Sequence, residues 1–110
     1  MSQTITPAIF NILVALADGE LHGYAIMQEI ERLTGTVPVG PTTLYRSIRQ
    51  MLGMGLIVEL PRRPADDGDE RRRCYRLTPA GRKAALAEAE RLDRLVRMAR
   101  SKRGLKRRAI

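Results

Sequence analysis

The spacing of the apolar residues changes twice along this chain, and those changes limit the folds open to it. Up to residue 53 the apolar residues recur every three or four positions, which predicts helices over 7–17, 21–33 and 41–53. The spacing then falls to two over 56–60 and 72–77, which is typical of strands. It returns to the helical period over 79–102. This order predicts a mainly α chain with a small β-hairpin.

Proline and threonine mark where these elements begin. Thr6-Pro7 and Thr78-Pro79 each place a capping side chain before a proline at the first helical position, where its missing N–H is no loss. The segment 61–71 is polar and contains an Asp-Gly turn signal, so it predicts a hairpin with a long, charged tip. Helix–helix–helix–hairpin–helix is the order of a winged helix-turn-helix, in which the third helix enters the major groove of DNA and the hairpin forms the wing.

The last predicted helix is longer than so small a domain can cover. Its apolar stripe continues past the end of the core, and an exposed stripe of this kind usually packs on a partner helix. We therefore expect a winged-helix DNA-binding domain over 1–78, a long C-terminal dimerisation helix over 79–103 and a basic, disordered tail over 104–110. The homodimer should be isologous, and its interface should be centred on Ala89, Leu92, Leu95, Val96 and Ala99.

The charge of the chain favours a polyanionic partner. Its 20 Lys and Arg residues against 12 Asp and Glu residues give a formal net charge of +8, which favours nucleic acid over membrane. Residues 1–61 nevertheless contain only three basic residues against five acidic ones. The surplus lies in 62–76 and in the last third, where a solvated helix face and frayed end is the alternative interpretation.

Several classes of protein are excluded by what the sequence lacks. Cys74 is the single cysteine, so no internal disulfide can form, and the chain fits a reducing compartment. His22 is the single histidine, and no Cys/His/Asp cluster surrounds it in the sequence. With no apolar run of about 18 residues and no signal peptide, we expect a cytoplasmic protein that has no membrane partner, metal, cofactor or catalytic site.

Side chains on the outer side of the third helix are candidates for DNA contacts. Thr42 and Thr43 can donate to phosphates beside the free N–H groups of the first turn, and Arg46 and Arg49 can reach guanine or the backbone. The structural alternatives are a helix cap for Thr43 and a solvated or ion-paired charge for Arg49. The predicted DNA-binding set is Thr42, Thr43, Tyr45, Arg46 and Arg49, with Tyr24 from the second helix and Arg71 and Arg72 from the wing.

Three segments together resemble the PadR family of bacterial transcriptional regulators. They are 12–26, with Leu21-His22-Gly23-Tyr24, then 42–57, with Thr43-Leu44-Tyr45, and 75–82, which reads YRLTPAGR. The length resembles the short branch with one C-terminal helix, which implies a dimer in which the last helix packs with the first, adding Phe10 and Leu13 to the interface. The resemblance also implies a small aromatic or phenolic effector.

The sequence departs from the family pattern at the third helix. Thr42 stands where a glycine is usual and Arg46 where a proline is usual, so the resemblance does not supply the DNA sequence that is bound. Leu52 and Met54 replace charged residues and are either extra core or an exposed apolar spot.

The resulting hypothesis is a sequence-specific DNA-binding transcriptional regulator. It would act as a dimeric repressor on a palindromic operator in double-stranded DNA, and a small ligand would release it. The alternative is a winged-helix module for protein interaction or ligand sensing, without sequence-specific DNA binding. No nucleophile–base pair supports an enzyme.

Overall fold

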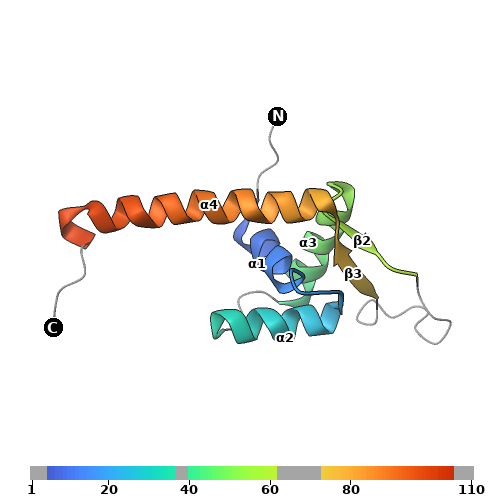
Figure 1. Cartoon of the computed structure of the whole chain (residues 1–110). Coiled ribbons are helices and arrows are strands. Elements are labelled where there is room, and N and C mark those ends of the chain that lie inside the picture. Colours follow the sequence, from blue (N-terminus) through green and yellow to red (C-terminus); the bar gives the residue numbers. More distant parts are fainter. Residues whose placement is uncertain (1–4, 37–39, 62–72, 106–110) are drawn as a thin grey trace.

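The fold is that of a computed structural model, which describes residues 5–36, 40–61 and 73–105. Figure 1 shows α4 along one side of the molecule and α2 along the opposite side, with α1 and α3 between them. In chain order the elements are α1 (Pro7–Ala15), β1 (Leu21–His22), α2 (Gly23–Thr34), α3 (Pro41–Gly53), β2 (Ile57–Glu59), β3 (Cys74–Leu77), α4 (Pro79–Ser101) and the 3-10 turn η3 (Arg103–Leu105).

Two predicted threonine caps are confirmed. The Oγ1 of Thr6 accepts a hydrogen bond from the backbone N–H of Ile9 at 3.1 Å and begins α1. The Oγ1 of Thr78 accepts from the N–H of Gly81 at 3.0 Å and also donates to the carbonyl of Gly55 at 2.6 Å. Thr78 therefore both caps α4 and ties its first turn to the end of α3.

The start of the second helix was predicted wrongly. Leu21 and His22 are extended and form β1, which pairs antiparallel with β3 in the register Leu21↔Tyr75 and His22↔Cys74. Among the described residues the sheet is three-stranded, in the order β1-β3-β2. A strand of two residues is too short to show a period of two, so the apolar pattern assigns it to the neighbouring helix.

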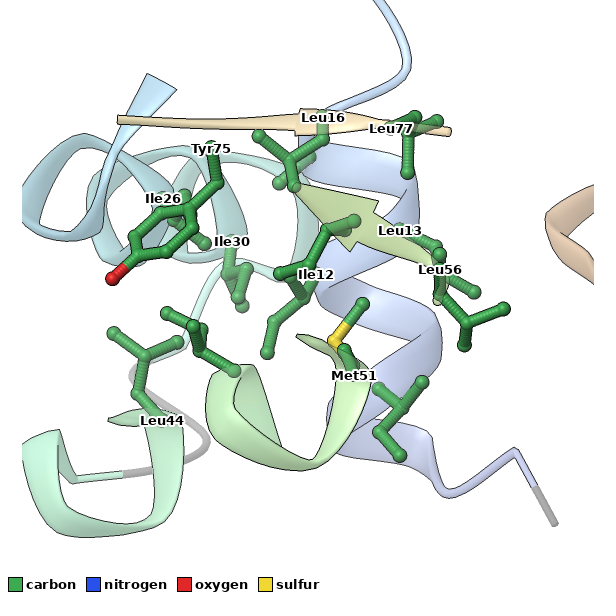
Figure 2. Packing of buried hydrophobic residues seen from close by; sticks show 14 residues of the cluster. Ile12, Leu13, Leu16, Ile26, Ile30, Leu44, Met51, Leu56, Tyr75 and Leu77 are labelled. Atoms are coloured by element: carbon green, nitrogen blue, oxygen red, sulfur yellow. The ribbon is translucent and has the colours of Figure 1, made fainter. Parts of the chain in front are cut away.

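The core lies between the helices and the small sheet. It combines residues of α1, α2 and α3 with Tyr75 and Leu77 of β3 (Figure 2). Leu52 and Met54 are half-buried and pack against this core, so the interpretation of the two as extra core is confirmed. Leu13 is 0 % exposed within this single chain. That contradicts its predicted place in a dimer interface, because its side chain has no surface left for a partner.

The first turn of α4 passes unusually close to the strand before it. A Cβ built on Gly81 would lie 2.0 Å from the carbonyl oxygen of Leu56. No other residue fits at this position without moving backbone. No helix within the described ranges is long and apolar enough to cross a membrane.

Candidate nucleic-acid and subunit interfaces

The helix α3 divides its residues between the core and the surface. Leu44, Ile48 and Met51 are at most 1 % exposed and hold the helix against α1. The exposed positions on its outer side are Thr42, Thr43, Arg46 and Arg49, which we call the α3 surface. Cationic and hydroxyl-bearing side chains on one exposed side of a short helix suit the phosphates and base edges of a major groove.

The first turn of α3 is open to an anion. Its N-cap residue is Gly40, which makes no side-chain cap hydrogen bond, and Pro41 follows at the first helical position. Thr43 is inside the helix and does not occupy the N-cap position, so the capping alternative for Thr43 is not what the structure shows. The uncapped N–H groups and the helix dipole favour a phosphate at this end.

Tyr45 differs from its prediction as an outward DNA contact. Its side chain packs against the core, and its hydroxyl oxygen is buried. A Cβ built on Gly23, the first residue of α2, would lie 2.7 Å from that oxygen. Tyr45 thus fills the space that Gly23 leaves and sets the approach of α3 to α2, so in this conformation it contacts no phosphate.

Tyr24 is exposed at the first turn of α2. Its side chain is 56 % exposed, and the N-cap residue His22 makes no side-chain cap hydrogen bond. The half-buried structural alternative is therefore not what the structure shows. An exposed phenol beside an uncapped helix end is a suitable donor to a phosphate.

The predicted wing contacts Arg71 and Arg72 lie outside the described residues. The base of the wing is described, and there the guanidinium of Arg73 lies 3.7 Å from the carboxylate of Glu59. Arg76 is exposed on β3, on the side opposite the buried Tyr75 and Leu77. The sequence prediction omitted Arg76, although its alternation with those two residues was the available signal.

The predicted dimer stripe is on α4. Leu95 and Val96 are 52 % and 44 % exposed, Ala89 is exposed, and Leu92 and Ala99 are half-buried. Leu92 and Phe10 face a groove of about 160 Å³ between α1 and α4, whose lining is Ile5, Pro7, Phe10, Asn11, Glu88, Arg91 and Leu92. The stripe therefore begins against α1 and continues beyond it uncovered.

A bidentate ion pair borders this groove. Arg91 donates to both carboxylate oxygens of Glu88, at 2.8 and 2.7 Å. These hydrogen bonds hold the pKa of the Glu88 carboxyl below its usual value. The polar edge of the groove thus stays charged, while its interior is mainly apolar.

Comparison with known proteins decides the family. The model of the transcriptional regulator PadR-like family matches residues 12–87. The chain belongs to this family. PadR regulators are DNA-binding and not enzymes, so this chain is a winged-helix transcriptional regulator, and the predicted family, fold class and absence of enzymatic function are confirmed.

Relatives and a solved structure agree with this membership. The chain is 39% identical over 87 residues to the transcriptional regulator Rv3488 of Mycobacterium tuberculosis, covering 79% of this chain and 77% of that protein. It is 40% identical over 84 residues to an uncharacterized 37.1 kDa protein in transposon TN4556 of Streptomyces fradiae, covering 76% of this chain but only 22% of that protein. A transcriptional regulator from Clostridium thermocellum superposes with a TM-score of 0.71 at 26% identity, covering 83% of this chain and 84% of that one.

Proposed function

We propose that this PadR-family regulator is a cytoplasmic, dimeric repressor that binds a palindromic operator, one α3 surface in each half-site. The observation that carries the proposal is the pairing of two uncovered surfaces on opposite parts of one small domain. These are the α3 surface with its uncapped helix end and the apolar stripe of α4. A single winged helix contacts few base pairs, and two copies joined through α4 multiply both affinity and discrimination.

The division of contacts follows from the chemistry of the side chains. Thr42, Thr43 and Tyr24 would donate to phosphates and fix the position of the domain on the duplex. Arg46 and Arg49 would reach base edges, where a good guanidinium–guanine pair discriminates by about 1 to 3 kcal/mol. Arg71 and Arg72 would add wing contacts to the backbone or the narrow minor groove.

The DNA contacts are tested by fluorescence anisotropy on a duplex selected from genomic fragments that the purified protein captures. Arg46→Ala and Arg49→Ala should each weaken binding about tenfold or more, and the matched control Arg32→Ala should not. Arg32 is exposed on α2 and is hydrogen-bonded to Glu29 at 2.7 Å. If no captured sequence is enriched, the protein is the alternative interaction or ligand-sensing module.

We also propose that a small aromatic or phenolic compound releases the protein from its operator. The mainly apolar groove beside Phe10 and Leu92 supports this, because it opens where α4 leaves the domain and a second copy would enlarge it. Titration with hydroxylated benzoic and cinnamic acids should dissociate the labelled operator from the wild-type protein, and Phe10→Ala should abolish that response. A response unchanged in Phe10→Ala places the effector elsewhere.

A further inference from the structure

The charge of α4 changes abruptly half-way along its length. Residues 82–93 contain three basic residues (Arg82, Lys83, Arg91) and three acidic ones (Glu88, Glu90, Asp93). Residues 94–105 contain five basic residues and no acidic one. The proposed DNA contacts use none of these five, so the basic half of the helix has no role in the function as proposed so far.

Three of the five lie on one side of the helix. Arg94, Arg97 and Arg100 are three residues apart, and all are exposed. At 3.6 residues per turn this side lies roughly opposite Leu92, Val96 and Ala99. We call it the arginine face. A second copy packed on the apolar stripe would leave the arginine face of both copies in solvent.

The guanidinium groups of this face are available to a partner. Arg94 and Arg100 form no ion pair with another described residue, and Arg97 pairs with Asp93 at 2.6 Å. That pair is exposed, with 76% of the Arg97 side chain and 58% of the Asp93 side chain in solvent. Exposed pairs of this kind contribute little to stability, so a phosphate can replace Asp93.

The arginine face is too far from the α3 surface to serve the same DNA segment. Figure 1 shows α4 on the opposite side of the molecule from α2, and its distal half projecting beyond α1. The first turn of α2, with Tyr24, belongs to the side away from α4. A straight duplex held by the α3 surface therefore leaves the arginine face free.

From this arrangement we infer that the arginine face binds the phosphate backbone of a second DNA duplex, so that the dimer bridges two segments of DNA. The inference rests on the proposed operator binding for the first duplex. Guanidinium groups bind phosphate oxygens in a bidentate fork. A membrane surface would need apolar side chains to insert beside the arginines, whereas the neighbours on this side, Asp93 and Ser101, are polar.

The test attaches the full chain to a surface through its N-terminus and adds two duplexes in turn. The first is an operator duplex of about 25 base pairs, enough for two half-sites one helical turn apart, added to saturation. The second is a labelled duplex of unrelated sequence. The wild-type protein should bind the second duplex on top of the first, in a manner that weakens steeply with salt.

The triple variant Arg94→Gln, Arg97→Gln, Arg100→Gln should bind the second duplex at least about tenfold more weakly, since each lost phosphate contact lowers the salt slope by about 0.9. Its operator affinity should stay within about twofold of wild type. The control Arg94→Lys, Arg97→Lys, Arg100→Lys keeps the charge and should retain the second duplex. Circular dichroism and light scattering on both variants exclude a change in folding or in oligomeric state.

The two proposals fail in different ways. If no operator binds in the first step, the proposed function is wrong, and the unrelated duplex then tests the arginine face directly in the same variants. If the operator binds but no second duplex is held, or the glutamine variant holds it as well as wild type, the arginine face is not a DNA site. Capture of anionic vesicles in place of the second duplex would also overturn the inference.

Discussion

At the scale of single residues, two glycines show how closely the elements approach one another. The Cβ of an alanine at position 81 would lie 2.0 Å from a backbone carbonyl oxygen, and at position 23 it would lie 2.7 Å from the hydroxyl of Tyr45. Backbone cannot move without breaking the sheet, whereas a tyrosine side chain can rotate. The cost of adding a methyl group therefore depends on what it meets.

Gly81→Ala should lower the free energy of unfolding by about 3 kcal/mol, at the upper end of overpacking changes, and Gly23→Ala by less. Urea unfolding followed by circular dichroism measures both. Gly53→Ala is the control, because a Cβ at position 53 in α3 meets nothing within 4 Å. It should be neutral or stabilise by up to about 1 kcal/mol. A Gly81→Ala protein as stable as wild type would contradict the close approach.

Leu13 gives a second residue-scale prediction. Because its side chain is 0 % exposed inside the chain, Leu13→Ala should cost about 2 to 5 kcal/mol of stability and leave the dissociation constant of any dimer unchanged. Thermal unfolding and sedimentation equilibrium separate the two effects. Weaker dimerisation at unchanged stability would restore Leu13 to the interface and refute its burial in this core.

At the scale of elements, the caps of α1 and α4 differ in what they join. Thr6 caps only its own helix, whereas Thr78 also donates to the carbonyl of Gly55, 23 residues away in sequence. A threonine cap contributes about 1 kcal/mol, and a further hydrogen bond adds about the same. The junction of α3, β2 and α4 therefore depends on one hydroxyl.

Thr78→Ala should cost about 2 kcal/mol and Thr6→Ala about half as much. Thermal unfolding of the two variants beside wild type measures the difference. Thr78→Ser is the positive control, since serine keeps the hydroxyl and should retain most of the stability. Equal losses in Thr78→Ala and Thr6→Ala would show that the bond to Gly55 contributes nothing.

At the scale of the whole molecule, the uncovered stripe of α4 predicts how the chain associates. Val96 is 44 % exposed and Leu86, on a different side of the same helix, is 62 % exposed. A glutamate at either position leaves the core of the single chain intact. Only Val96 lies on the stripe that the proposed second copy covers.

Val96→Glu should therefore give a monomer by light scattering at micromolar concentration, where wild type is a dimer, and Leu86→Glu should remain a dimer. Operator affinity should fall by 10² or more in Val96→Glu, because the second half-site is no longer held by the first. A wild-type protein that is monomeric at this concentration would refute the dimer outright.

The sequence alone determined the order of elements and most of their ends. The threonine–proline starts of α1 and α4 depend on interactions within a few residues, as does the inward row of Leu44, Ile48 and Met51. Such local interactions can be recognised from residue type and spacing, so the family and the exposed positions of α3 followed from the chain itself. The exposed stripe of α4 was visible for the same reason.

Only the tertiary structure decided the placements that depend on distant partners. Leu21 and His22 become a strand because β3 lies beside them. Tyr45 turns inward because Gly23 leaves it room, and Leu13 is covered by the rest of the core instead of a second copy. Two residues are too few for a period, and the depth of a side chain depends on what folds over it. The sequence places a residue on one side of a helix, but the packing of the other elements determines whether that side meets the core, DNA or a partner.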